Sequence, residues 1–275
     1  MELHAVARRD RDRVLALANR ETSWRCGFGQ SPPHDVGSAF DAATAQASRL
    51  LESNGAVAGF ALVTATTPGV GHFSAIASER RAFVTLVDWA CADLSAPATL
   101  RTSVALTRAA RDVLASCGFT PYLVQRTMAL TPELAGPPGL PAPCRFADFQ
   151  GRWLAPLLAT YVAAWPPDEV DLIEAERSFR ESDGLVLAVD GERVAGYVLW
   201  ERVDDAIGVI HEVAVHPDSR RCGMGSALTR LAIDRLQPVT SRIELLVVGP
   251  NPARLMYERL GFEVVEEVEF LTRAA

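Results

Sequence analysis

Residues 207–233 read IGVIHEVAVHPDSRRCGMGSALTRLAI, a stretch that predicts a strand, a short loop and a helix in immediate succession. Residues 207–215 are mostly apolar and β-branched, which favours a strand that ends before Pro217. Residues 224–236 carry apolar side chains at the spacing of one helix face. The stretch therefore predicts a strand that turns sharply into an amphipathic helix.

The turn into the helix is basic and rich in glycine. It consists of Arg220, Arg221, Cys222, Gly223, Met224, Gly225 and Ser226. Glycine lets the backbone approach a ligand closely because it has no Cβ. The first N–H groups of a helix lack intrahelical partners and lie at the positive end of its dipole, and arginines beside them donate charge-assisted hydrogen bonds to phosphate oxygens. This combination predicts a cradle for pyrophosphate.

Two other glycine-rich phosphate motifs are excluded. A Rossmann fingerprint needs a third glycine and an acidic residue about 20 positions later, and no third glycine follows Gly225 at the required spacing. A P-loop needs a lysine, whereas all 27 basic residues of this chain are arginines.

The composition is that of an ordinary globular protein, with 275 residues of which 49% are hydrophobic and 22% charged. The formal net charge of −7 argues against a nucleic-acid-binding protein, which usually presents a basic face. No apolar run approaches the roughly 18 residues that cross a bilayer, and residues 1–14 are too charged for a secretory signal. We therefore expect a cytoplasmic protein without a membrane or nucleic-acid partner.

The cysteines support the same compartment. They are widely spaced, form no CxxC pair and stand at positions 26, 91, 117, 144 and 222. Such a pattern predicts reduced thiols, with neither a disulfide framework nor a metal site.

A proline-rich stretch near the middle divides the chain. Residues 131–144, TPELAGPPGLPAPC, hold too many prolines and glycines for a helix or a central strand. We expect residues 132–144 to form a linker stiffened by proline. The linker would separate a domain of residues 1–131 from a domain of residues 145–275.

The two halves resemble each other in three blocks that recur in the same order. AVAGFALV at 56–63 matches RVAGYVLW at 193–200, Arg80-Arg81 matches Arg220-Arg221, and ARDVLASCGF at 110–119 matches ARLMYERLGF at 253–262. These matches predict two copies of one fold, with a chance likeness of two α/β segments as the alternative.

The second half shows helical and strand patterns in turn. Apolar spacing predicts helices, and short β-branched runs bounded by turn residues predict strands. The expected helices are 151–165, 169–181, 224–236 and 251–260, and the expected strands are 185–189, 194–203, 207–215, 242–248 and 262–271. This order predicts an α/β (α+β) fold with a mixed sheet and helices on both faces.

The turn at residues 220–225, preceded by VAVHP at 213–217, resembles motif A of the GNAT superfamily of acetyl-CoA-dependent acetyltransferases. Residues 251–262, NPARLMYERLGF, resemble a second block of that superfamily. The resemblance covers residues 145–275 closely and the first half loosely. It implies two tandem GNAT-like domains, each with a mixed, mostly antiparallel sheet, flanking helices and a splayed central pair of strands.

By that resemblance the chain is an N-acetyltransferase that uses acetyl-CoA as cosubstrate and no metal. A primary amine of a small molecule would attack the thioester directly. The backbone of Val213, Ala214 and Val215 would pair with the pantetheine arm, and residues 220–226, Asn251 and Arg254 would complete the acetyl-CoA site. Tyr257 matches the tyrosine that protonates the departing sulfur, with a tyrosine packed at the surface as the alternative.

The expected base is Glu212, which interrupts an apolar strand. A carboxylate there must be solvated or paired, so it should line a cleft. His211 has a more suitable ordinary pKa, but strand alternation directs it to the opposite face. Some members of the superfamily carry the acid earlier, where this chain has Val209. His211 and a chain of water molecules are the alternatives.

The first half lacks these residues. With Arg80 aligned to Arg220, Phe83 stands at the position of Gly223, Thr85 at that of Gly225, Leu114 at that of Tyr257 and Arg108 at that of Asn251. A phenyl ring would block the cradle, so we expect one acetyl-CoA site, in the second half. A degenerate copy beside a working one loosely resembles mycothiol synthase.

Two other functions stay open, a non-catalytic acyl-CoA sensor and an acetyltransferase for the N-terminal or side-chain amines of proteins. The sequence pI of about 5.3 would steer a cationic acceptor towards the chain. We expect residues 161–180, Tyr197 and Trp200 to build the acceptor pocket, but they contain no motif that identifies the amine.

Overall fold

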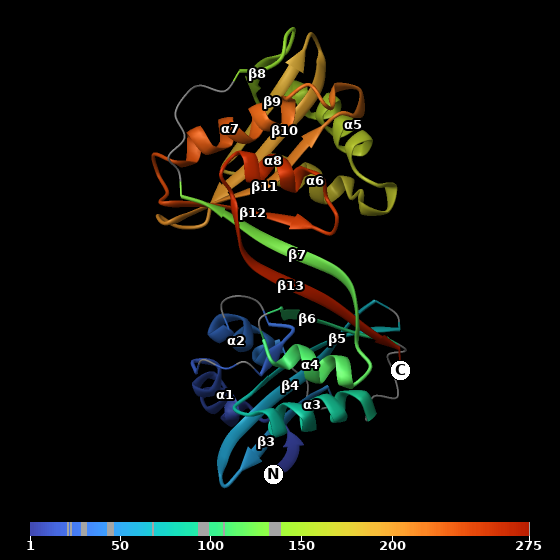
Figure 1. Cartoon of the computed structure of the whole chain (residues 1–275), viewed down its shortest axis with the longest axis vertical. Helices are drawn as coiled ribbons and strands as arrows, with labels where there is room; N and C mark the ends of the chain where they lie inside the picture. Colours follow the sequence, from blue (N-terminus) through green and yellow to red (C-terminus); the bar gives the residue numbers. More distant parts are fainter. Residues whose placement is uncertain are drawn as a thin grey trace. The chain divides into compact units, whose positions relative to one another are not determined.

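The computed structural model describes residues 1–20, 22, 24–28, 32–42, 47–67, 69–92, 99–106, 108–131 and 139–274. They form two compact units (Figure 1): unit 1 comprises Met1–Gln125 and Glu267–Ala275, and unit 2 comprises Arg126–Glu266. This division differs from the expected linker at 132–144, of which 132–138 lie outside the described residues. The reason is that strands β7 (Thr120–Leu130) and β13 (Glu263–Ala274) each begin in one unit and end in the other.

Unit 2 is a mixed sheet with helices on both faces (Figure 1). Its strands follow the order β7-β12-β11-β10-β9-β8. From β8 to β11 neighbouring strands are antiparallel, whereas β11 and β12 are parallel. The bounds are β8 Arg145–Asp148, α5 Leu154–Ala164, α6 Leu172–Glu181, β9 Gly184–Asp190, β10 Arg193–Arg202, β11 Ile207–Val215, α7 Met224–Leu236, β12 Arg242–Val248 and α8 Ala253–Arg259.

The two faces of this sheet have separate cores. On one face Leu228 of α7 packs in a cluster with Val198 of β10 and with residues of α8. On the other face Leu157 of α5 and Phe179 of α6 pack with Tyr197 of β10. Because successive residues of a strand point to opposite faces, β10 supplies side chains to both clusters.

The expected elements of the second half are confirmed, with small shifts at their ends. The bounds of β11, α7 and β12 agree to the residue, and the expected helix at 151–165 starts with a 3₁₀ turn before α5. Strand β8 was not expected, because a segment of four residues is too short to show the alternation of apolar and polar side chains that marks a strand.

Unit 1 has the same layers. Its strands follow the order β1-β3-β4-β5-β6-β13, and β2 pairs with β5 beside this path. Helices α3 and α4 pack on one face, and α1 and α2 on the other. The bounds are β1 Glu2–Ala5, α1 Arg11–Ala18, β2 Arg25–Cys26, α2 Pro32–Ala42, β3 Ser48–Ser53, β4 Ala56–Thr67, β5 Val70–Ala77, α3 Arg80–Ala92, β6 Thr99–Ala105 and α4 Ala110–Ser116.

Two of the three repeated blocks occupy equivalent places in the units. Gly59 and Gly196 lie at the same point of β4 and β10, and an added Cβ would lie 2.8 Å from Leu86 Cδ1 in unit 1 and 2.8 Å from Ala214 O in unit 2. Both glycines therefore let the backbone pack closely against its neighbours. The blocks at 110–119 and 253–262 form the equivalent helices α4 and α8.

The match of Arg80-Arg81 to Arg220-Arg221 is wrong. Arg80 and Arg81 lie in the first turn of α3, whereas Arg220 and Arg221 lie in the loop before α7. Only residues 78–79 separate β5 from α3, but residues 216–223 separate β11 from α7. Phe83 is fully buried in the core of unit 1. We call residues 216–223 the cradle loop. Unit 1 has no such loop between β5 and α3, so its phosphate cradle is missing rather than blocked by Phe83.

Candidate active site

The centre of unit 2 is a fork between two parallel strands. Pairing of β11 with β12 runs from Ile207 and Arg242 to Ile210 and Leu245 and then stops. We call the segments beyond this point, 211–215 and 246–248, the β11–β12 fork. The open edge of β11 can pair its backbone N–H and C=O groups with an extended ligand. Val213, Ala214 and Val215, which were predicted to bind the pantetheine arm, lie in this segment.

A β-bulge marks the start of the fork. Leu199 of β10 pairs with Glu212 and Trp200 pairs with Ile210, so His211 is the extra residue. Bulges redirect side chains and are frequent next to active sites. The His211 side chain is exposed and its Nε2 lies 2.9 Å from Oε1 of Glu201. Glu212, by contrast, shares the face of the sheet with Tyr197.

Glu212 is half-buried and receives two hydrogen bonds on one oxygen. Trp165 Nε1 donates to Oε1 at 2.6 Å, and the Tyr197 hydroxyl donates to the same atom. Burial raises the pKa of Glu212, and the two donors and nearby His211 offset part of that effect. A carboxylate with a raised pKa is a stronger base at neutral pH, as general base catalysis requires.

A row of aromatic rings leads to this carboxylate from α5 and α6. Phe179 lies between two tyrosines, with its ring centroid 6.0 Å from that of Tyr161 and 5.3 Å from that of Tyr197. Burial and the adjacent carboxylate raise the pKa of Tyr197, so its hydroxyl stays protonated and donates. Trp200 is not part of this row, because it lies in the core on the α7 face.

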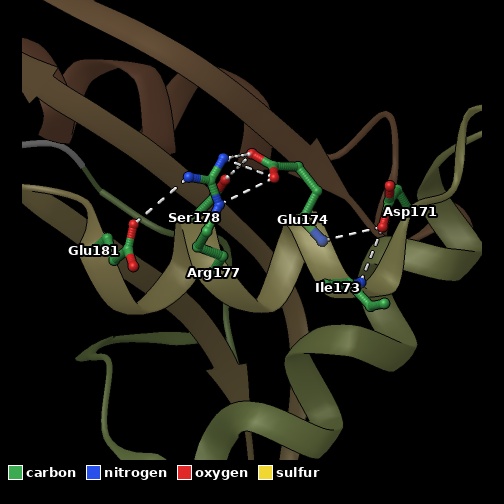
Figure 2. Close-up of polar contacts among 6 residues, drawn as sticks. All are labelled: Asp171, Ile173, Glu174, Arg177, Ser178 and Glu181. Atoms are coloured by element: carbon green, nitrogen blue, oxygen red, sulfur yellow. Dashed lines mark hydrogen bonds and ion pairs between the residues drawn. The ribbon is translucent and has the colours of Figure 1, made fainter.

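The outer face of α6 is occupied by contacts within the helix (Figure 2). Asp171 caps the helix by accepting hydrogen bonds from the backbone N–H groups of Ile173 and Glu174 at 3.0 Å. Arg177 forms an ion pair with Glu174 at 2.6 Å. These exposed charged groups are engaged with one another. The buried face of α6 carries Phe179, whose ring contacts Tyr197, the residue that donates to Glu212.

The predicted cradle lies at the N-terminus of α7. Gly223 has a φ of +89°, a backbone conformation that glycine adopts without strain, and no side chain caps the helix. The first bond of the turn runs from Ala227 N to Gly223 O at 3.0 Å, so the N–H groups before Ala227 have no intrahelical acceptor. An added Cβ at Gly223 would meet no atom within 4 Å. The space that an anion would need is therefore open.

Several residues of the cradle loop and of the first turn of α7 also have structural contacts. An added Cβ at Gly225 would lie 3.3 Å from Met256 Sδ, so this glycine permits close packing of α7 and α8. The Met224 side chain is buried, which leaves only its backbone for a ligand. Cys222 Sγ donates to Ser219 O at 3.0 Å. Arg221 is exposed, whereas Arg220 binds two backbone carbonyls.

The residues predicted on α8 lie beside the fork in different environments. Tyr257 is 8% exposed and packs on Phe262, and burial raises the pKa of its phenol to about 12. The phenol therefore keeps its proton at neutral pH, as a proton donor must. Asn251 Oδ1 accepts a hydrogen bond from Ala253 N at 2.9 Å, and Arg254 Nε donates to Glu258 at 2.8 Å. Asn251 thus binds the first backbone N–H of α8, and Arg254 pairs with a residue one turn later in the same helix.

Sequence reasoning placed Trp165 and Tyr197 in the expected acceptor pocket but missed that both donate hydrogen bonds to Glu212. Two signals were present: a tryptophan directly before Pro166-Pro167, and a tyrosine inside an apolar strand whose buried hydroxyl needs a partner. In the described part of the chain no cluster of three or more His, Cys, Asp or Glu could hold a metal ion, and no described helix is long and apolar enough to cross a membrane.

Unit 2 thus combines a splayed parallel strand pair, a half-buried carboxylate beside a bulge and a helix N-terminus without a side-chain cap. Residues 152–262 match the acetyltransferase (GNAT) family. Mycothiol acetyltransferases from Kocuria rhizophila and Beutenbergia cavernae are each 30% identical to the chain, with 92% of both sequences covered. The chain belongs to the GNAT family of acetyltransferases.

Other relatives match over a shorter span or in fold alone. The mycothiol acetyltransferase of Actinosynnema mirum is 34% identical over 154 residues, so the chain spans about half the length of that relative (50%). A GCN5-related N-acetyltransferase from Sphaerobacter thermophilus has a TM-score of 0.72 at 18% identity and covers 99% of this chain and 95% of its own. A tandem GNAT protein from the clavulanic acid biosynthesis pathway has a TM-score of 0.66 at 17% identity and covers 99% and 98%. These two structures share the fold over nearly the whole chain.

Proposed function

We propose that unit 2 transfers the acetyl group of acetyl-CoA to a primary amine of a small molecule by direct attack. The observation that carries the proposal is Glu212, held half-buried at the start of the fork by Trp165 and Tyr197. An unused carboxylate at this depth would lower stability, because burial disfavours the charged form. The position of this carboxylate beside an open strand edge favours catalysis over an acyl-CoA sensor.

In this mechanism Glu212 accepts a proton from the ammonium, and the lone pair of the neutral amine then attacks the thioester carbon. The nitrogen loses its second proton when the intermediate collapses, and this proton replaces the one that Tyr257 gives to the sulfur. Acetyl-CoA supplies the activated acetyl group. The C–S bond then breaks, and Tyr257, whose phenol is protonated at neutral pH, donates its proton to the sulfur. Backbone N–H groups at the start of α7 and the exposed guanidinium of Arg221 bind the pyrophosphate.

The relatives are named mycothiol acetyltransferases, which suggests a small-molecule acceptor related to mycothiol. The net charge of −7 also favours a cationic amine. Protein amines stay a second candidate, because the aromatic row beside Glu212 shows no group that selects a small molecule.

The test is a CoA-release assay with a panel of amines at saturating acetyl-CoA. The panel contains the deacetylated form of mycothiol, a polyamine, an aminoglycoside and a peptide with a free N-terminus. We expect one of the small amines to accelerate release. Binding of acetyl-CoA without turnover on any amine would instead identify a sensor, and turnover only on the peptide would identify a protein acetyltransferase.

A further inference from the structure

The indole of Trp165 makes an unusual contact for a residue at the end of a helix. Trp165 follows α5 directly, is half-buried and donates from Nε1 to Glu212 Oε1 at 2.6 Å. An indole N–H can donate but neither accept nor ionise at neutral pH. Its presence therefore fixes Oε1 as an acceptor in every protonation state of the carboxyl group.

The Tyr197 hydroxyl donates to the same oxygen. In the described part of the chain no donor binds Oε2 of Glu212. With Oε1 engaged twice, a proton taken from an amine is received by Oε2. The two donors thus orient the carboxylate so that its free oxygen is the basic one.

Trp165 is itself held from the cradle loop. Arg220 Nη2 donates to the carbonyl of Ala164 at 3.0 Å, and Nε of the same guanidinium donates to the carbonyl of Val215 at 3.1 Å. Ala164 is the residue directly before Trp165, and Val215 is the last residue of β11. Because a guanidinium is a rigid plane, Arg220 fixes the end of α5 against the strand that carries Glu212.

We propose that Trp165 is a positioning residue for the base Glu212, and that Arg220 acts as its support rather than as a phosphate ligand. The proposal rests on the proposed function, because it assumes that Glu212 is the base. It assigns to Arg220 and Arg221, adjacent residues of one loop, two different tasks. Arg220 orients the base, and Arg221 binds the cosubstrate.

The titratable groups around Glu212 define the expected pH dependence. They are Tyr197 on β10, His211 on β11 and, acting on Tyr197, Tyr161 on α5. The hydrogen bond from Trp165 favours the charged form of Glu212 and so lowers its pKa. Removal of that donor should raise the pKa and shift the rising limb of the pH–rate profile to higher pH.

The experiment compares pH profiles of kcat at saturating acetyl-CoA for the full chain with Trp165→Phe, Arg220→Met and Arg221→Met. Phenylalanine keeps a ring at position 165 but lacks the donor, and methionine keeps an unbranched side chain without the guanidinium. We expect the limb to move to higher pH in Trp165→Phe and Arg220→Met, with a roughly tenfold loss of kcat near neutral pH, of the order set by one hydrogen bond to a charged group. Arg221→Met should weaken acetyl-CoA binding and leave the limb in place.

The outcomes separate the inference from the function on which it rests. An unmoved limb in Trp165→Phe would overturn the positioning role. If Arg220→Met weakens acetyl-CoA binding but leaves the rising limb of the pH–rate profile at the same pH, Arg220 is a phosphate ligand. The Glu212→Gln variant is measured in parallel. If it keeps both the kcat of the unmodified chain and the rising limb of the pH–rate profile, the assignment of Glu212 as the base is wrong. If Glu212→Gln loses both while Trp165→Phe changes neither, only the inference fails.

Discussion

Parallel strands diverge at the centre of both units, but in unit 1 the space between them is filled by the chain itself. Pairing of β5 with β6 runs from Val70 and Thr99 to His72 and Arg101 and then stops, as pairing of β11 with β12 does in unit 2. Residues 24–27, which we call the inserted segment, lie between the diverging strands of unit 1. They take the place that an extended ligand would take between β11 and β12.

The inserted segment is bonded to both strands. Trp24 O accepts from Ala77 N at 2.8 Å on the β5 side, and Gly27 N donates to Ser103 O at 2.7 Å on the β6 side. Ser74 Oγ donates to Gly27 O at 3.1 Å. An added Cβ at Gly27 would collide with the carbonyl oxygen of Phe73, so only glycine fits there.

The residues around the two forks differ accordingly. Leu62 pairs with Ser74 in unit 1 where Leu199 pairs with Glu212 in unit 2, so a hydroxyl replaces the carboxylate. The pairing of β4 with β5 is regular at this point, without a counterpart of the His211 bulge. The fold therefore persists without the groups that would make it an active site.

The largest expected effect concerns the number of acetyl-CoA sites. Calorimetric titration should find one site per chain, because among the described residues a cradle loop and an open fork occur in unit 2 and not in unit 1. Gly223→Trp should abolish binding, since its side chain would enter the open space at the start of α7. The matched control is Gly55→Trp in unit 1, which also replaces a glycine of positive φ facing open space and should keep the affinity. Two sites of similar affinity would show that the inserted segment can be displaced.

Glu212→Gln should lower kcat by about 10²–10⁴-fold, the range typical of general acid–base groups. Turnover of the unmodified chain should rise with pH as Glu212 loses its proton, at a pH above the ordinary range for glutamate because burial raises its pKa. The variant should lose this limb, whereas Ser74→Ala at the equivalent position of unit 1 should keep it. If His211→Ala abolishes the limb and Glu212→Gln does not, His211 is the base.

Tyr257→Phe should lower turnover by about 10²-fold, near the low end of the same range, because a thiolate is a tolerable leaving group. The ring and its contact with Phe262 are kept, so the affinity for acetyl-CoA should change little. The measurement is kcat and the dissociation constant side by side. Equal losses in both would make Tyr257 a structural residue.

Gly27→Ala should destabilise unit 1 without touching the chemistry of unit 2. The positive φ costs about 1–2 kcal/mol for an L-residue, and the close approach of Gly27 to Phe73 O adds to this. Gly55→Ala has a similar φ of +76° but open space around it, so the difference in unfolding free energy between the variants isolates the close approach. Equal stabilities would mean that the inserted segment adjusts freely between its strands.

The sequence predicted the second half more completely than the first. Residues 207–236 have strong periodicity and a recognisable turn, and the structure agrees with them closely. In the first half, Arg80-Arg81 suggested a loop because the residue types matched, yet both arginines begin a helix. A pair of arginines carries little conformational information, whereas the glycine pattern of the cradle does.

Local chemistry thus sufficed to predict the strand–turn–helix of the cradle and the candidate base, since each depends on residues near one another in the chain, and the comparison of the two halves predicted the repeat. Only the tertiary structure decided which groups from distant parts of the chain come into contact. Trp165 reaches Glu212 only because α5 packs on β10 and β11, and Gly27 reaches Ser103 only because β5 and β6 diverge. Such contacts depend on the register of strands and the packing of helices, which follow from the burial of whole faces rather than from any short stretch of sequence.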